Sequence, residues 1–291
     1  MRLYLSAMEN REIQDIYSCM KDRNGFFSYY YMRTSIPNSI KAFKKAKKHN
    51  MHIIIDSGAH TFFSEKGVDR AGVVKKNTQT KETYRQYIDN YYKWLMACKD
   101  YIDYFVELDI GEIVGQKKVD EWYNELKVKG LDSKCIRVYH PKCCPKGWWE
   151  EQIKTNTSKY VGIEGKRFGK VTIDYKKLIK QAYDKGVKVH GFAMTGIKDI
   201  TTYPFYSVDS TSWQAGVRFG TLPVFDKKSC SIKQKRYSDI NKWDKSMNLA
   251  DYYNDNKKVG RMALSKQGIK SFHELEDYVT NLWIKRNIVW E

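Results

Sequence analysis

Eight short apolar runs, separated by longer stretches with helical spacing, constrain the fold of this chain more than any other feature. The runs are five to eight residues long and rich in β-branched and aromatic residues, which is typical of buried strands. They span residues 3–7, 26–32, 52–58, 104–110, 136–140, 160–165, 187–194 and 205–210. Strands that alternate with helices indicate a parallel sheet, and eight such units predict a closed (β/α)8 barrel, an α/β fold.

Local helix signals support this interpretation. Apolar and aromatic residues recur at helical spacing over 83–99, and further helices are predicted over 119–130 and 174–186. Asp174 is placed to cap the last of these helices, and Gly186 is placed to end it. A doubly wound sheet is the competing architecture, but neither the GxGxxG nor the Walker A phosphate turn occurs. The barrel is therefore preferred, with its active site expected at the C-terminal ends of the strands.

Two connecting segments are too long for simple turns. The polar segment 64–80 is interpreted as a lid or a nucleic-acid loop, and the segment 211–236 becomes basic towards its end. We predict a catalytic barrel over residues 1–237 and a helical extension, packed on the barrel, over residues 238–291. The sequence Ser-Phe-His-Glu at 271–274 has the spacing of a capping box and is predicted to open the final helix.

The net charge of +18, from 52 Lys and Arg against 34 Asp and Glu, favours a polyanionic partner. Cations that neutralise phosphates release bound counterions, which drives such binding. Coding by AT-rich DNA, which favours Lys, Asn, Tyr and Ile, explains the charge equally well. The 22 Tyr and 8 Trp add stacking faces beside the cations and favour nucleic acid, whereas no amphipathic basic helix points to a membrane surface.

The chain is expected to be a soluble intracellular protein with reduced thiols. No apolar run approaches the ~20 residues that cross a bilayer, and the N-terminus turns polar too early for a secretory signal. The 6 Cys form no CxxC motif and the 6 His form no HxH motif. A metal near His140, Cys143 and Cys144 is conceivable, but adjacent cysteines rarely ligate one zinc, so no metal is expected. His190 is interpreted as a packed core histidine.

Acidic residues stand at the ends of several predicted strands. Asp56, Asp109 and Asp209 follow apolar segments, and three such residues in one barrel favour a function over helix capping. Gly58 allows a tight turn of the backbone against a ligand. Two carboxylates across a pocket can divide the roles of nucleophile and proton carrier, which suits glycosidic-bond chemistry. With a cationic rim, the expected substrate is an N-glycosidic bond in a nucleic acid. Further polar residues at strand ends are His140, Glu164 and Thr195.

Four segments together resemble the tRNA-guanine transglycosylase superfamily. IIIDSGAHTFF resembles its DSGGFQ-type segment, and VDSTSWQAGVRFG resembles the segment that carries the nucleophilic Asp followed by Arg-x-Gly. YVGIEGK resembles the base-binding strand, and HGFAMTG resembles the Met-Gly turn beneath the base. The four occur in the family's order, and the resemblance covers roughly residues 1–225.

The resemblance implies a role for each matching residue. Asp209 matches the nucleophile that attacks C1′ of the sugar, and Asp56 matches the acid and base that handles the proton of the departing and incoming bases. Asp109 matches the residue that reads the guanine-like edge. The implied substrate-binding residues beside Asp109 are Ser57, Gly58, His140, Gly162, Ile163, Glu164, Met194 and Thr195. The implied nucleic-acid-binding residues are Arg218, Lys166 and Arg167, for which solvated surface charge is the alternative.

Departures from the family pattern narrow the implied substrate. The CxCxxC zinc site of the tRNA-modifying members is absent, DSG continues as AHTFF, and the fifth strand ends in His140 instead of Gln. These departures resemble the branch of bacteria and phages that inserts 7-deazaguanines into DNA. They imply a cytoplasmic pentosyltransferase, in a bacterial or phage-infected cell, that needs no cofactor. It would exchange guanine in DNA, in preference to tRNA, for a free base such as preQ0. A partner that opens the duplex is compatible with this prediction.

Three alternatives remain open at this point. The first is the same exchange on RNA. The second is a barrel that binds modified bases or nucleic acid without catalysis. The third is an N-glycoside hydrolase, in which water replaces the incoming base.

Overall fold

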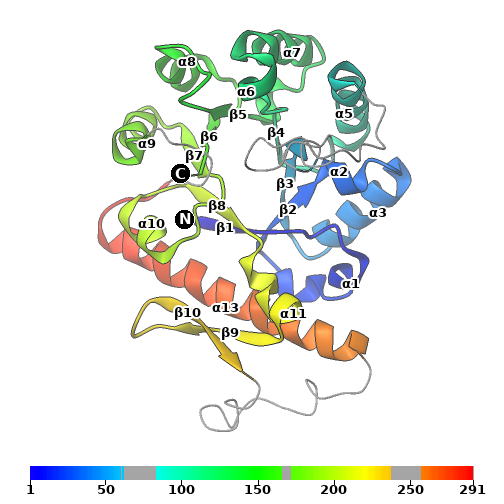
Figure 1. Ribbon diagram of the computed structural model, residues 1–291, viewed down its shortest axis with the longest axis vertical. Helices are drawn as coiled ribbons and strands as arrows, with labels where there is room; N and C mark the ends of the chain where they lie inside the picture. The colour runs from blue at the N-terminus through cyan, green and yellow to red at the C-terminus, as the bar shows by residue number, and fades with distance from the viewer. Residues whose placement is uncertain (60, 62–82, 166–171, 237–256, 291) are drawn as a thin grey trace.

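The computed structural model describes all residues except 60, 62–82, 166–171, 237–256 and 291. Eight parallel strands close into a barrel, in which each strand pairs with the next and β8 pairs with β1 (Figure 1). The strands are β1 (Arg2–Ser6), β2 (Asn24–Ser28), β3 (His52–Asp56), β4 (Tyr104–Val106), β5 (Cys135–Tyr139), β6 (Tyr160–Ile163), β7 (Lys188–Gly191) and β8 (Ser207–Ser210). The predicted (β/α)8 barrel is confirmed, and each predicted run overlaps one strand.

The second strand is shorter than predicted. The run 26–32 was expected to be one strand, but β2 ends at Ser28 and the next four residues form α2 (Tyr29–Met32). Aromatic residues favour strands by propensity, yet Tyr29 packs its ring against Tyr91 at 4.6 Å between centroids. Packing against a neighbouring helix therefore outweighs the strand propensity of this segment.

Helices surround the barrel in the predicted alternation. They are α1 (Arg11–Gln14), α3 (Ile36–Lys47), α5 (Tyr84–Cys98), α6 (Gly111–Val114), α7 (Gln116–Val128), α8 (Trp148–Thr155), α9 (Tyr175–Tyr183), α10 (Ile197–Thr202), α11 (Ala215–Phe219) and α13 (Lys257–Lys285). Short 3-10 turns are η1 (Tyr17–Met20), η2 (Asp132–Lys134) and η3 (Ser212–Gln214). Within the described part of the chain, no helix is long and apolar enough to span a membrane.

Local side chains set the ends of these helices. The Thr83 hydroxyl accepts from the backbone N–H of Gln86, whose side chain accepts from Thr83 in return, so a capping box opens α5. The predicted cap of α9 is confirmed, because the Asp174 side chain accepts from the backbone N–H of Lys177. Gly186 has φ of 64°, the left-handed conformation that ends helices.

The final helix completes the outer ring. α13 packs against β1, α1 and α10, so it fills the place between β8 and β1 (Figure 1). The buried Glu276 carboxylate accepts from the Leu3 backbone N–H at 2.9 Å and from the Asn24 amide at 2.7 Å. These bonds fasten α13 to the beginnings of β1 and β2. The C-terminal helix is therefore part of the barrel's own packing, while the predicted boundary at 237/238 lies outside the described residues.

The predicted capping box at 271–274 is wrong. α13 begins at Lys257, and Ser271 lies inside it, fully buried, where its hydroxyl donates to the Pro223 carbonyl at 2.8 Å. A serine within a helix can donate to a neighbouring element as readily as a serine at the start of a helix can cap it. The Ser-x-x-Glu spacing does not distinguish these two roles. Pro223 belongs to a hairpin of β9 (Thr221–Asp226) and β10 (Ser231–Arg236), into which most of the long segment 211–236 folds.

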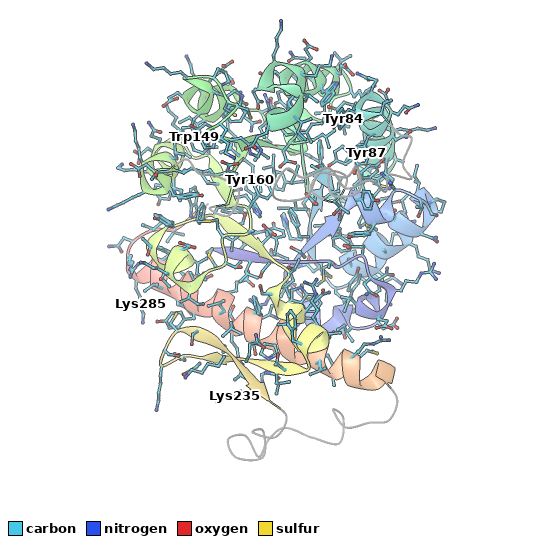
Figure 2. All side chains as sticks on the ribbon, in the orientation of Figure 1. Tyr84, Tyr87, Trp149, Tyr160, Lys235 and Lys285 are labelled. Atoms are coloured by element: carbon cyan, nitrogen blue, oxygen red, sulfur yellow. The ribbon has the colours of Figure 1, made fainter. Side chains whose placement is uncertain are left out.

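The inside of the barrel is filled with aromatic and branched side chains. This cluster consists of Tyr4, Phe26, Ile54, Val106, Ile136, Val138, Tyr160 and Tyr206. Tyr160, labelled in Figure 2, lies inside the ring of strands and is fully buried. The cluster closes the barrel, so a ligand would bind above it, at the C-terminal ends of the strands.

Candidate active site

Acidic residues gather at the C-terminal ends of the strands. Asp56 is the last residue of β3, and Asp209 lies in β8. Asp109, His140 and Glu164 follow β4, β5 and β6 within three residues. Because the strands are parallel, all these positions share one end of the barrel. The Asp56 carboxyl interacts electrostatically with both Asp109 and Asp209, so the three aspartates form one group.

Hydrogen-bond donors face both oxygens of Asp209. Its Oδ1 accepts from the backbone N–H of Ala193 at 2.8 Å and lies 3.4 Å from Nε2 of His190. Its Oδ2 accepts from the Ser6 hydroxyl at 3.2 Å. Ala193 has φ of 53°, a left-handed backbone that is uncommon without glycine and that presents its N–H to Asp209. The Asp209 side chain is thus held from two strands, by Ser6 at the end of β1 and by His190 and Ala193 in and just after β7.

Asp56 has the opposite environment. Burial, followed by the neighbouring carboxylates Asp109 and Asp209, raises the pKa of Asp56 from 3.8 to about 8, against one backbone hydrogen bond from Gly58. Burial penalises the charged form, and two like charges penalise it again. Asp56 is therefore mostly protonated at neutral pH and can both release and take up a proton there.

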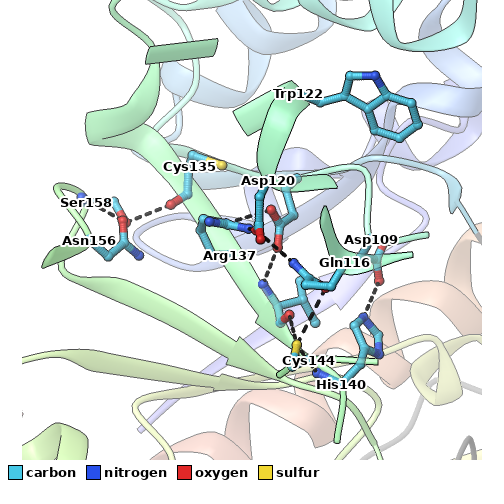
Figure 3. Close-up of polar contacts among 12 residues, drawn as sticks. Asp109, Gln116, Asp120, Trp122, Cys135, Arg137, His140, Cys144, Asn156 and Ser158 are labelled. Atoms are coloured by element: carbon cyan, nitrogen blue, oxygen red, sulfur yellow. Dashed lines mark hydrogen bonds and ion pairs between the residues drawn. The ribbon is translucent and has the colours of Figure 1, made fainter. Parts of the chain in front are cut away.

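Asp109 and His140 form a second polar group. Asp109 Oδ1 accepts from the Ser57 hydroxyl at 3.2 Å, and its Oδ2 lies 3.7 Å from His140 Nε2, a pair drawn in Figure 3. His140 Nδ1 lies 2.9 Å from Glu164 Oε2. Burial alone lowers the pKa of His140, but Asp109 and Glu164 outweigh it and raise the pKa to about 10. The ring is thus an imidazolium at neutral pH, with a carboxylate at each nitrogen.

The Ser57–Gly58 turn packs against aromatic side chains of α2 and α5. The Tyr87 hydroxyl donates to the Ser57 carbonyl at 2.7 Å. Gly58 has φ of 74°, and a Cβ at this position would lie 2.5 Å from Cβ of Tyr30. Only glycine fits this turn, so the predicted tight turn of the backbone is present at the end of β3, where it packs against Tyr30.

Of the remaining predicted substrate-binding residues, Gly162, Ile163 and Met194 are buried and Thr195 is half-buried. Gly162 and Ile163 are buried in β6, and the Phe192 ring occupies the space beside Gly162, 2.4 Å from an added Cβ. A base can reach the backbone of Gly162 only if Phe192 moves. Met194 is also buried, and the Thr195 hydroxyl donates to the Ser210 hydroxyl at 3.2 Å.

The predicted nucleic-acid contacts divide between described and undescribed residues. Arg218 is exposed on α11, shortly after the strand that carries Asp209, and donates to the Gln214 side chain at 3.0 Å. Phe219 beside it is 75% exposed, which is unusual for a phenylalanine. Lys166, Arg167 and the segment 64–80 lie outside the described residues.

Sequence reasoning missed three residues that face this site. His190 is buried as predicted, but its Nε2 faces Asp209, which its place within an apolar strand did not reveal. Ser6 ends β1 and binds Asp209. Glu9 follows β1 and accepts from the Ser28 backbone N–H at 3.3 Å; burial raises its pKa. A search for polar residues just beyond β1 would have found Ser6 and Glu9.

Figure 3 also shows a polar cluster on the outer side of β5, where Arg137 meets Asp120. Arg137 is fully enclosed and donates to Glu107 at 2.7 Å, and the other oxygen of Glu107 accepts from the Val138 backbone N–H at 2.7 Å. The guanidinium carbon lies 4.2 Å from the centre of the Tyr123 ring. All three charged groups are paired, and Asp120 belongs to α7, so this cluster fastens α7 to the barrel.

One group of residues has the spacing of a metal site. Ligand atoms of Glu112, His140 and Glu164 lie within 4.8 Å of one another. The ion pairs His140–Glu164 and Lys142–Glu112, the latter at 3.4 Å, account for this grouping without a metal. All six cysteines are free thiols, and the nearby Cys144 thiol donates to Gln116 at 3.5 Å.

Comparisons with known proteins add evidence on the fold alone. No protein-family model matches the chain, and no curated protein matches it. A crystal structure from Coccidioides immitis, provisionally assigned as a fructose-1,6-biphosphate aldolase, is similar with a TM-score of 0.52 and 9% identity. The alignment covers 97% of this chain and 93% of that protein. At this identity the likeness shows the closed (β/α)8 barrel, an architecture frequent among enzymes.

Proposed function

We propose that this protein is a transglycosylase that exchanges guanine in a nucleic acid for a free 7-deazaguanine such as preQ0, and that its substrate is DNA in preference to tRNA. The observation that carries the proposal is the contrast between two neighbouring carboxyl groups. Asp56 has a pKa near 8, whereas donors face both oxygens of Asp209. Such a pair supplies a proton carrier and a nucleophile at one site.

Asp209 is the nucleophile in this proposal. It attacks C1′ of the target nucleoside, and a covalent bond between the carboxylate and the sugar forms as the bond from C1′ to guanine breaks. Asp56 protonates the departing base and later takes the proton of the incoming one. A pKa of Asp56 near the operating pH favours both transfers. No cofactor is needed, because one glycosidic bond replaces another.

The second polar group fits the edge of a guanine-like base. Such a base offers N–H donors at N1 and at the exocyclic amine, next to an acceptor at O6. Asp109 provides a carboxylate acceptor, and the His140 imidazolium beside it provides a positive charge. A negative group for the N–H donors and a positive group for the O6 acceptor distinguish guanine and 7-deazaguanines from adenine.

A nucleic-acid substrate is supported by the charge of +18 and by the exposed Arg218 and Phe219 next to the Asp209 strand. The target nucleoside must leave the base stack before Asp209 can reach C1′, which costs a few kcal/mol. Arginine can hold a phosphate and phenylalanine can stack on an unpaired base, and both contacts would offset part of this cost. The preference for DNA rests on the missing tRNA-type zinc motif.

Isotope exchange tests the proposal. The protein is incubated with labelled guanine and either duplex DNA, single-stranded DNA or tRNA, and incorporation is measured together with the covalent adduct under denaturing conditions. Asp209→Asn is expected to abolish both, and Asp56→Asn to lower exchange by at least about 100-fold. Asp184→Asn, at the exposed C-terminal cap of α9, is the matched control and leaves both unchanged.

Each alternative has its own outcome in this experiment. Incorporation into tRNA alone selects the RNA enzyme, and accumulation of abasic sites selects the hydrolase. Binding of base or nucleic acid without incorporation selects a non-catalytic barrel. Exchange that survives in Asp209→Asn refutes the assigned nucleophile.

A further inference from the structure

A buried row of side chains leads from the inside of the barrel to Asp209. His190 is fully buried, and its Nε2 lies 3.4 Å from Asp209 Oδ1. Its Nδ1 lies 2.6 Å from the Ser207 hydroxyl, which in turn is hydrogen-bonded to the hydroxyl of Tyr160. These four residues come from β6, β7 and β8. None of these four side chains caps a helix or forms an exposed ion pair.

The direction of the hydrogen bonds in this row follows from the carboxylate of Asp209, with which the row ends. An ionised carboxylate only accepts, so His190 must carry its proton on Nε2 to bind Asp209. A neutral ring then has a bare Nδ1, which accepts from the Ser207 hydroxyl. The Ser207 hydroxyl donates its only O–H to His190, so it accepts from the Tyr160 hydroxyl. Burial raises the pKa of Tyr160, which keeps its proton in place.

Three aromatic side chains surround the His190 imidazole. The Phe26 ring lies parallel to it, with 5.6 Å between centroids and 5° between planes. The Phe192 ring lies 4.5 Å away at 64°, and the Tyr4 ring lies 6.2 Å away at 67°. These rings restrict rotation of the fully buried His190 ring, because protein interiors are close-packed.

The two oxygens of Asp209 are consequently unequal. Oδ1 faces two donors, the backbone N–H of the exposed Ala193 and the Nε2–H of the buried His190, whose ring packs among aromatic side chains. Oδ2 faces the Ser6 hydroxyl at 3.2 Å, and among the described residues no second donor to it is found. A hydroxyl can rotate away from its acceptor, whereas a backbone N–H cannot.

We propose that His190 is a positioning residue that, with the Ala193 N–H, holds Oδ1 so that Oδ2 attacks C1′. Ser207 and Tyr160 fix the ring's proton on Nε2. This inference rests on the proposed transglycosylase function. As Oδ2 bonds to C1′, the electron pair of the bond from C1′ to guanine leaves with the base, which takes the Asp56 proton. In the second half a nitrogen of the incoming base bonds to C1′ and its proton passes to Asp56, while the electron pair of the O–C1′ bond returns to Asp209. The two donors at Oδ1 stabilise the restored charge.

Variants along the row test the activity side of the inference. His190→Leu is expected to slow formation of the covalent adduct by about 100-fold, with the KM for the free base unchanged. His190→Gln, which retains an N–H donor, is expected to recover part of this loss. Ser207→Ala and Tyr160→Phe, which remove single hydroxyls, should slow the step by about 10-fold each.

Tyr206→Phe is the matched control. The Tyr206 ring packs against Tyr160 at 5.3 Å inside the same barrel, but its hydroxyl is not part of the row. It should leave the rate of adduct formation unchanged. Equal rates in wild type, Ser207→Ala and Tyr160→Phe would overturn the inference even if Asp209→Asn is inactive.

A spectroscopic measurement tests the row without reference to activity. Nitrogen-15 NMR of histidine-labelled protein distinguishes the two neutral tautomers, and His190→Gln assigns the His190 signal among the 6 histidines. The wild type is expected to show a single Nε2–H form, and Ser207→Ala a mixture of forms. A proton on Nδ1 in the wild type overturns the inference. Absence of exchange on every nucleic acid, together with the Nε2–H form, would refute the proposed function and leave the row established.

Discussion

Replacing Asp56 by Asn is expected to stabilise the fold while it removes activity. Burial, followed by the Asp109 and Asp209 carboxylates, raises the pKa of Asp56 from 3.8 to about 8. Between pH 3.8 and about pH 8, Asp56 is ionised in the unfolded chain but keeps its proton in the folded protein. Stability is therefore lost as the pH rises through this window, and the whole penalty is present above the folded pKa. Asparagine cannot ionise and escapes the penalty.

The magnitude follows from the same values. One pKa unit corresponds to about 1.4 kcal/mol, so a rise from 3.8 to about 8 corresponds to at most about 5–6 kcal/mol. Asp56 keeps partial contact with solvent, which screens the repulsion between carboxylates. We therefore expect Asp56→Asn to raise the free energy of unfolding by about 2–3 kcal/mol at pH 8, and by less than about 1 kcal/mol at pH 5.

Urea denaturation of wild type and variants between pH 5 and 8 measures this difference. Asp209→Asn is the comparison, because there the amide group would face the donors Ala193 N–H and Ser6 hydroxyl. It is expected to lower the free energy of unfolding by about 1–2 kcal/mol. The two substitutions thus have opposite signs. A destabilised Asp56→Asn, or a difference that does not change with pH, would refute the reasoning.

Three further predictions concern the frame around the site. Arg137→Ala leaves the Glu107 carboxylate buried without its cation and should cost about 3–5 kcal/mol in chemical denaturation; a cost below about 1 kcal/mol would contradict the assigned ion pair. Gly58→Ala places a methyl group 2.5 Å from Tyr30 Cβ at a φ of 74° and should cost at least about 2 kcal/mol, visible as a lower melting temperature. His140 has a raised pKa of about 10, so its charge stabilises the fold fully below about pH 6.5 and this contribution is lost as the pH rises to about 10. His140→Gln should therefore flatten the pH dependence of thermal unfolding in that window, and an unchanged profile would contradict the ion pairs.

Much of the fold was predictable because it rests on local patterns. Alternating apolar runs and helix signals indicated all eight strands, and Asp174 and Gly186 marked the ends of α9 correctly. The errors arose where a pattern has two meanings. The aromatic run after Ser28 is a helix because of its packing, and Ser271 is an interior helix residue that bonds to Pro223.

The site was predictable in part for a geometric reason. In a parallel barrel every strand end lies on one face, so Asp56 and Asp209 could be brought together from the strand pattern alone. The environment of each carboxyl could not be obtained in this way. The environment of Asp209 depends on Ser6, which is distant in the sequence, and on His190 and the Ala193 N–H, which lie in and just after an apolar strand.

The amino-acid sequence by itself determined the barrel and the set of acids at its mouth, because strand periodicity and strand ends are local properties. Only the tertiary structure decided which acid holds a proton. Burial and two neighbouring carboxylates set the pKa of Asp56, while a backbone N–H and a packed imidazole orient Asp209. These effects depend on distances between strands that lie far apart in the chain. The strength of an electrostatic interaction is set by distance in space and by burial, not by separation in the sequence.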